Sequence, residues 1–230
     1  MNEGQEFGSR GPADLRILTG AVVWMCAIQF FVAQVVVQAA WTTPFSLATN
    51  YISDLGNTAC ANYPADSVTY VCSPWHAVMN ISFFLQGVII IAGALLIAPF
   101  LRRHRAKIWV LALLILTGAG MLGVGMFPEN VDNNAHVFSA ALQFVTGNLA
   151  LVIIGITRII RATAKWFSAA SIALGSLGLA ATVLFPTGNH LGIGIGGMER
   201  VAAYTFPIWL IGTGLCLVSQ AGRSRVAWEK

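Results

Sequence analysis

The sequence predicts an all-α polytopic membrane protein, a bundle of six transmembrane helices with both termini on the cytoplasmic side. Three observations support this fold class. The chain of 230 residues is 57% hydrophobic and 10% charged, whereas a soluble domain carries about 25% charged residues. Six apolar runs without Lys, Arg, Asp or Glu follow one another, and the basic residues gather in short clusters between them.

The six apolar runs define the expected transmembrane elements. Each is close to the roughly 20 residues that a helix needs to cross a bilayer core. A transmembrane strand needs only about 10 residues of alternating polarity, and the runs show no sustained alternation. Backbone groups in lipid must find partners within their own segment, so helices are expected. The runs are Ile17–Ala40, Ala77–Leu101, Ile108–Met126, Val137–Ile156, Trp166–Leu184 and Val201–Leu217.

The distribution of basic residues sets the expected orientation. All of the 13 Lys and Arg residues except Arg200 lie at the termini or in the second and fourth connections between helices. Such an excess is typical of cytoplasmic segments, so it indicates a multi-pass protein of the plasma (inner) membrane, and no nucleic acid partner is expected. The expected segments are a cytoplasmic tail at 1–16, a transmembrane domain at 17–217 with outer loops at about 41–75, 127–136 and 185–200, and a cytoplasmic tail at 218–230.

Two cysteines in the first outer loop, Cys60 and Cys72, are expected to form a structural disulfide. Thiols outside the cytoplasm can oxidise. Closing so short a loop contributes about 3 kcal/mol on the chain-entropy model. A metal-binding pair is the alternative, but no second cysteine pair or close histidine pair supports it.

Polar and charged residues gather on the outer side of the predicted bundle. Arg200 is the lone basic residue there, and its expected partners are Asp54, Glu129 or Asp132. The segment "ISDLG" is expected to fold over the outer mouth of the bundle, where it clamps the first helix to the last, lines a head-group site, or does both. The predicted ligand-binding or polar cluster comprises Ser53, Asp54, Glu129, His136, Glu199 and Arg200.

Further polar side chains extend inward from this side and could line a pocket. His76 and Asn80 are four residues apart and share one helix face. His136 and Gln143 fall on one face of the fourth helix, and His190 follows the fifth. Such residues also form hydrogen bonds that hold neighbouring helices together, and this structural role is the alternative to a pocket.

Metal and serine-hydrolase chemistry have weaker support. Three outer histidines, His76, His136 and His190, would suffice as zinc ligands with a carboxylate, but they come from separate connections and no HExxH motif is present. No metal or cofactor is therefore assigned. A triad of Ser53, a histidine and Asp54 is disfavoured because adjacent side chains do not readily flank one imidazole.

Three motifs together resemble a known family: "NYISDLG" after the first helix, "FPEN" with His136 following it, and "GGMER" opening the last helix. The chain resembles, over about Ile17 to Leu217, the six-helix membrane proteins grouped as domain-of-unknown-function family 998. The "SDLG" segment is also similar to that of Frag-type and autophagy-modulator membrane proteins, some of which are associated with lipid remodelling. The resemblance implies the fold but no activity. Its signature residues are Ser53, Asp54, Gly56, Pro128, His136, Glu199 and Arg200.

The function expected from the sequence is binding or handling of a membrane lipid or similar amphiphile in a polar pocket that faces the outer leaflet. One alternative is a membrane-embedded, metal-dependent hydrolase. Another is a structural or assembly partner without a ligand, acting as a homo-oligomer or with another membrane protein.

Overall fold

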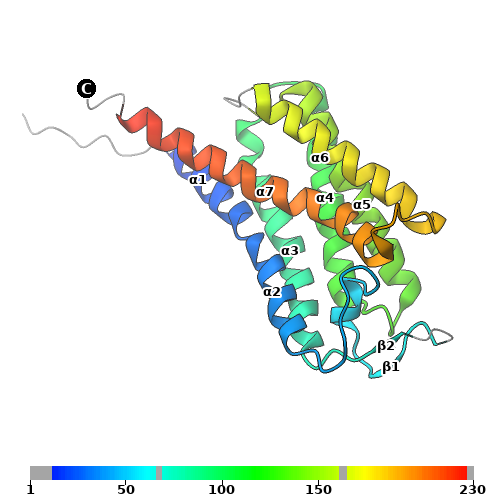
Figure 1. Ribbon diagram of the computed structural model, residues 1–230. Coiled ribbons are helices and arrows are strands. Elements are labelled where there is room, and N and C mark those ends of the chain that lie inside the picture. The colour runs from blue at the N-terminus through cyan, green and yellow to red at the C-terminus, as the bar shows by residue number, and fades with distance from the viewer. Residues whose placement is uncertain (1–11, 66–68, 161–164, 227–230) are drawn as a thin grey trace, which may run out of the picture.

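The computed structural model describes residues 12–65, 69–160 and 165–226, which form a bundle of long helices (Figure 1). Within these ranges, six helical segments are long and apolar enough to span a membrane, so the expected six-helix fold is confirmed. The helices are α1 (Pro12–Met25), α2 (Ile28–Ala39), α3 (His76–Ile97), α4 (Ala106–Met126), α5 (Asn133–Thr157), α6 (Lys165–Leu184) and α7 (Gly194–Val226). The short elements are the 3₁₀ helices η1 (Ser53–Gly56), η2 (Ala98–Phe100) and η3 (Phe185–Thr187) and the strands β1 (Ala61–Asn62) and β2 (Tyr70–Val71).

The first span consists of two helices, α1 and α2, where the apolar run predicted one. At the junction the backbone hydrogen bonds tighten to the i→i−3 pattern, as when the Ala27 N–H donates to the Trp24 carbonyl (3.1 Å). Just after the junction, the Gln29 side chain donates to the Ser82 carbonyl (3.2 Å) and to Gln86 Oε1 (3.0 Å) on α3. The break therefore coincides with a polar attachment between the first two spans.

The helices pack mainly against their neighbours in sequence, and α7 closes the bundle against α1 and α6 (Figure 1). Small residues permit the closest approaches, as is usual where helices pack in lipid. A Cβ atom added to Gly87 of α3 would lie 2.6 Å from the carbonyl oxygen of Gly118 on α4. The backbones of α3 and α4 therefore lie too close here for any larger residue at position 87.

A buried polar network joins α5 to α7 in the middle of the bundle. Asn148, which is fully buried, donates to the carbonyls of Phe144 (2.9 Å) and Ala202 (3.0 Å). Its Oδ1 accepts a bond from the Thr205 hydroxyl (2.6 Å). Both ends of the amide are thus satisfied, as burial away from water requires.

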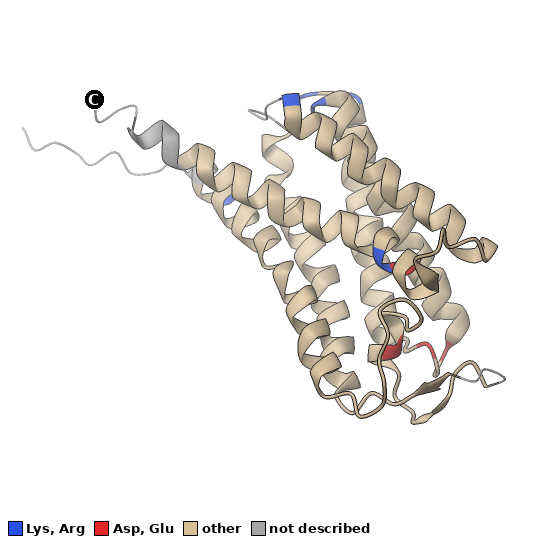
Figure 2. Ribbon diagram, in the orientation of Figure 1, with Lys and Arg blue, Asp and Glu red and all other residues tan. Residues whose placement is uncertain are grey.

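Most of the described basic residues lie at one end of the bundle and the carboxylates lie toward the other, as Figure 2 shows. Among the residues whose side chains are described, the basic cluster surrounds the start of α4 and the start of α6. The carboxylates lie in η1 and where α5 and α7 begin, together with Arg200. By the positive-inside rule, the end that carries the basic cluster is expected to face the cytoplasm. The orientation of the termini stays a prediction. We call the carboxylate-bearing end the acidic end.

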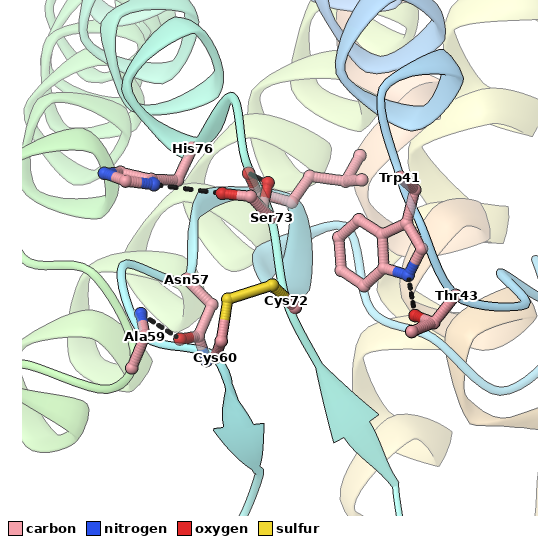
Figure 3. Close-up of a disulfide and its surroundings, with 9 residues drawn as sticks. Trp41, Thr43, Asn57, Ala59, Cys60, Cys72, Ser73 and His76 are labelled. Carbon is pink, nitrogen blue, oxygen red and sulfur yellow. Dashed lines mark hydrogen bonds between the residues drawn. A yellow bond between two sulfur atoms is a disulfide. The ribbon is translucent and has the colours of Figure 1, made fainter.

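A small hairpin covers part of the acidic end. Strands β1 and β2 pair antiparallel, with Ala61 opposite Val71. Cys60 and Cys72 flank this pairing and form a disulfide, which confirms the expected bond (Figure 3). Next to it, Ser73 Oγ donates to the Leu55 carbonyl (2.7 Å), so the hairpin is attached to the segment that carries η1.

Candidate functional site

A segment before η1, together with η1 itself, lies across the acidic end; we call residues 47–56 the strap. Arg200 of α7 holds it through the backbone. Arg200 Nη1 donates to the carbonyls of Leu47 (3.0 Å) and Asn50 (2.7 Å), and also to that of Gly196 one turn earlier on α7 (2.9 Å). The guanidinium carbon lies 5.8 Å from the centre of the Phe45 ring, within the range of a cation–π contact. Arg200 therefore fastens the strap to α7 through Nη1, whereas its buried Nε has no partner among the described residues.

Glu199, the neighbour of Arg200, fastens the same strap further along. Its Oε2 accepts the Ile52 backbone N–H, and its Oε1 lies 3.3 Å from Ser53 Oγ. The backbone of α7 approaches closely here, because a Cβ atom on Gly196 would lie 2.2 Å from the Asn50 carbonyl oxygen. The apolar pattern predicted that this helix begins at Val201, but α7 begins earlier, so Glu199 and Arg200 lie inside it.

Ser53 and His136 form a hydrogen-bonded pair between the strap and α5. Ser53 Oγ lies 2.8 Å from His136 Nε2, and His136 Nδ1 lies 2.7 Å from the Phe127 carbonyl oxygen. A carbonyl can only accept, so Nδ1 carries a proton. In the neutral ring Nε2 is then an acceptor for the Ser53 hydroxyl proton, and Glu199 Oε1 is the other acceptor of that proton. Asp132 caps α5 by accepting the Ala135 N–H (3.0 Å), which fixes the first turn on which His136 lies.

Asp54 and Glu129 form a carboxyl pair buried beside this contact. Asp54 accepts bonds from Asn50 Nδ2 and the Tyr51 N–H (both 3.0 Å), and Glu129 accepts one from Asn57 Nδ2 (2.9 Å). Burial raises the pKa of Asp54, and burial followed by the charge of Asp54 raises the pKa of Glu129 well above its ordinary value. The interaction between the two carboxyl groups lowers the pKa of Asp54 and raises that of Glu129, so Glu129 is the first of the pair to take up a proton as pH falls.

A cavity of about 570 Å³ opens between the strap, α5, α6 and the hairpin. Tyr63 of the hairpin covers one side and donates its hydroxyl to the Glu129 carbonyl (2.7 Å). Burial, followed by the nearby carboxylates, raises the pKa of Tyr63 to about 12, so this hydroxyl stays protonated as a donor. The lining combines polar residues (Ser53, Glu129, Asn133, His136, His190, Glu199) with apolar ones (Val137, Ala140, Phe144, Phe185, Ile195).

A second cavity of about 30 Å³ lies deeper in the bundle and shares Ser53 and Glu199 with the first. It is large enough for a water molecule. Gln86 Nε2 is buried without a partner within the described chain, and Gln86 and Gln143 both line this cavity. Ser53 and Glu199 therefore lie between the large cavity and a small, mostly apolar cavity that Gln86 and Gln143 also line.

The structure brings together some of the residues predicted from sequence and separates others. Ser53, Glu129, His136, His190 and Glu199 line the large cavity, and Gln143 lines the small one.

Four predicted residues lie outside both linings. The Asp54 side chain bonds within the strap, to Asn50 and Tyr51, and Arg200 bonds to backbone carbonyls. His76 Nδ1 pairs with the Ser73 carbonyl (3.0 Å; Figure 3), and Asn80 donates to the Gly56 carbonyl (2.9 Å). Among residues 12–65, 69–160 and 165–226, no group of three or more His, Cys, Asp or Glu is arranged to hold a metal ion.

Tyr63, Asn57 and Asn133 also belong to the site, although no sequence pattern predicted them. Tyr63 lies between the two disulfide cysteines, and that closed loop was the one signal that this tyrosine is held near the acidic end. Asn57 directly follows the "SDLG" motif and supplies the hydrogen bond that Glu129 needs. A buried acid at Glu129 implies such a donor, but the sequence does not say which one.

A family model described as "Protein of unknown function (DUF998)" matches residues 25–215. The match covers all six spans in whole or in part. Comparison with curated proteins and with solved structures found no match. The further similarity to Frag-type and autophagy-modulator proteins stays a prediction.

Proposed function

The chain belongs to the DUF998 family, and we propose that it binds a membrane lipid or similar amphiphile in the large cavity at the acidic end. The observation that supports this proposal most directly is the cavity itself. Its volume of about 570 Å³ lies within the 300–1,000 Å³ of typical small-molecule sites. The lining divides into an apolar part and a polar part, which is the division that an amphiphile needs.

The apolar part of the lining suits an acyl chain. Val137, Ala140 and Phe144 follow one face of α5, and Phe185 and Ile195 lie across from them at the ends of α6 and α7. Because these helices lie within candidate membrane spans, the chain of a bound lipid would run parallel to those of the bilayer. The proposed ligand therefore enters with its chain along α5 and α6.

The polar part of the lining suits a neutral or cationic head group. Among the residues that the structure describes, this lining has two carboxyl groups, Glu129 and Glu199, and no Lys or Arg. Arg200 lies close by in sequence, but its Nη1 is already shared among three backbone carbonyls. An anionic head group would find two acidic side chains and no cation to balance its charge, whereas hydroxyl or ammonium groups would find acceptors.

We place the protein in the plasma (inner) membrane with both termini in the cytoplasm, so that the cavity serves the outer leaflet. The basic cluster at the opposite end supports this orientation. The disulfide supports it too, because disulfides persist in oxidising compartments outside the cytoplasm.

Native mass spectrometry of the full chain, released from membranes in mild detergent, tests the proposal. The wild type should retain a lipid-sized adduct. Ala141 of α5 lines the cavity, and Ala141→Trp should fill it and abolish the adduct. Leu149→Trp, a partly exposed position on the same helix outside the lining, should keep it.

Three results would count against the proposal. A clean apo mass of the wild type would favour an assembly partner without a ligand. Retention by Ala141→Trp would place the lipid elsewhere. A metal-sized adduct that disappears in His136→Ala would favour the metal-dependent hydrolase.

A further inference from the structure

We propose that the large cavity is also a catalytic site, in which Ser53, activated by His136, cleaves a carboxylic ester of the bound amphiphile. This inference rests on the proposed binding function, because it takes the ester to be part of the cavity's ligand. It differs from the metal-dependent alternative, since it uses one histidine and a hydroxyl nucleophile in place of three metal-ligating histidines.

The geometry of the pair matches that of a serine nucleophile and its general base. Ser53 Oγ lies 2.8 Å from His136 Nε2, within the 2.6–3.2 Å reach expected for such a pair. A third group must orient the base, and the Phe127 carbonyl does so by accepting the Nδ1 proton at 2.7 Å. Nε2 is thereby left as the atom that takes the hydroxyl proton.

The Ser53 hydroxyl makes no hydrogen bond to the backbone of the described residues, and its partners are the side chains of His136 and Glu199. It opens the 3₁₀ helix η1, and a serine near a helix start would often cap it. In η1 no side-chain capping bond is present. By contrast, Ser73 donates to the Leu55 backbone (2.7 Å) and Ser171 to its own helix (2.8 Å). The Ser53 hydroxyl contacts the two ionisable side chains His136 and Glu199, and it lines the cavity.

The surroundings hold the pair in place and limit its access to water. His136 is 5% exposed and Ser53 is half-buried, and both border the same cavity. Glu199 acts as a positioning residue, because it accepts the Ile52 N–H and so fixes the backbone that carries Ser53. Ser53 itself lies on the strap, but contacts from α5 (His136) and α7 (Glu199) hold it in place. Helices position such groups more firmly than a free loop does.

The proposed reaction is hydrolysis through an acyl-serine intermediate, with water as the second reactant. Ser53 Oγ forms a bond to the ester carbonyl carbon as its proton passes to His136 Nε2. The bond from that carbon to the alcohol oxygen then breaks, and Nε2 returns the proton to the leaving alcohol. A water molecule attacks the acyl-serine, giving its proton to Nε2, and the carboxylic acid leaves as Ser53 regains the proton. The sum is ester plus water to acid plus alcohol.

The cavity defines the substrate class. The acyl chain lies along the apolar part of the lining from Val137 to Phe144, and the ester carbonyl lies at Ser53. The alcohol part faces Glu129 and Asn133, which favours an uncharged or cationic alcohol. The expected substrates are therefore long-chain acyl esters such as monoacylglycerols, and phosphate-bearing esters are disfavoured.

A long-chain alkyl fluorophosphonate is the first probe, applied to the full-length protein in detergent. An activated serine displaces fluoride from phosphorus and keeps the phosphonyl group, which mass spectrometry of peptides locates. The wild type should be labelled at Ser53. Ser53→Ala should lose the label, and His136→Gln should slow labelling by about 10²–10⁴-fold, the usual contribution of a general base.

Ser139→Ala is the matched control, because Ser139 lies on α5 near His136 but outside both cavity linings. It should label at the wild-type rate. Ser53→Ala removes one hydroxyl and should unfold at nearly the wild-type temperature, so its loss of label reports chemistry. Absence of label on folded wild type, or label at another residue only, overturns the proposal.

Native mass spectrometry of the same variants separates this proposal from the binding function. If the wild type retains a lipid but Ser53 is not labelled, the catalytic inference fails and binding stands. If neither lipid nor label is found, both fail. Release of fatty acid from a monoacylglycerol by the wild type and by Ser139→Ala, but not by Ser53→Ala, supports both.

Discussion

The buried carboxyl group of Glu129 makes the stability of the fold sensitive to pH. Burial raises the pKa of Glu129 well above 4.5, so the folded protein binds this proton more tightly than the unfolded chain does. The stabilising contribution of protonated Glu129 is therefore complete below about pH 4.5, and it is lost as pH rises through the raised folded-state pKa. Thermal stability should decline over that window.

Glu129→Gln should remove part of this decline. A glutamine keeps an acceptor for Asn57 and a donor for Asp54, and it does not titrate. The unfolding temperature in detergent, measured from pH 4.5 to pH 8, should fall less steeply for the variant than for the wild type. Parallel curves for the two proteins would contradict the assignment of the proton to Glu129.

Some residues of the cavity could be predicted from the sequence because they are polar and lie next to apolar runs. Ser53, Glu129, His136 and Glu199 stand out as polar residues beside apolar runs, and the structure places all four in one lining. Arg200 stands out for the same reason, yet it lies outside the lining because its acceptors are backbone carbonyls. Sequence shows which side chains carry charge but not which backbone atoms will meet them.

At the scale of elements, the contact of α6 with the Asn148 network constrains a single glycine. A Cβ atom on Gly178 would lie 2.2 Å from Asn148 Oδ1, the atom that accepts the Thr205 hydroxyl. Gly178→Ala should therefore displace the amide, leave buried polar groups unpaired, and destabilise the fold by roughly 3 kcal/mol.

Gly212→Ala is the matched control, because a Cβ atom on Gly212 of α7 meets nothing within 4 Å. Its unfolding temperature should equal or slightly exceed that of the wild type, since alanine favours helix. Equal unfolding temperatures for Gly178→Ala and Gly212→Ala would show that the Asn148 network can rearrange without loss of stability.

The disulfide-bonded hairpin is the element that holds Tyr63 over the cavity. Its cysteines are 12 residues apart in sequence, and on the chain-entropy model a loop of this size contributes about 3 kcal/mol. A reductant should lower the unfolding temperature of the wild type to that of a Cys60→Ser, Cys72→Ser double variant. The double variant itself should not respond; a similar response of both would point to the free cysteines instead.

The boundaries of the elements were less predictable than their number. No proline or glycine marks the break between α1 and α2 at Cys26 and Ala27, and its polar attachment through Gln29 is a tertiary contact. The last helix begins earlier than its apolar run because the strap supplies partners for Glu199 and Arg200. A hydropathy pattern predicts that the helix begins after these two charged residues. A helix tolerates charged side chains when they have hydrogen-bond partners, as Glu199 and Arg200 do.

At the scale of the whole molecule, the separation of charges predicts the orientation in the membrane. Fusions to the C-terminus should behave as cytoplasmic: green fluorescent protein should fluoresce and alkaline phosphatase should be inactive. Phosphatase inserted after Gly188, in the connection between α6 and α7 at the acidic end, should be active. The reverse pattern would place the cavity in the inner leaflet and would require a new account of the disulfide.

The way in which Arg200 holds the strap has a consequence for how the chain tolerates substitution. Its acceptors are main-chain oxygens, which every amino acid carries. In a saturation mutagenesis map, position 200 should therefore accept almost nothing, while position 47, which lies opposite and is 56% exposed, should accept nearly any residue. Paired substitutions would leave no trace of this contact, so methods that infer proximity from covariation would overlook the bond that closes the acidic end.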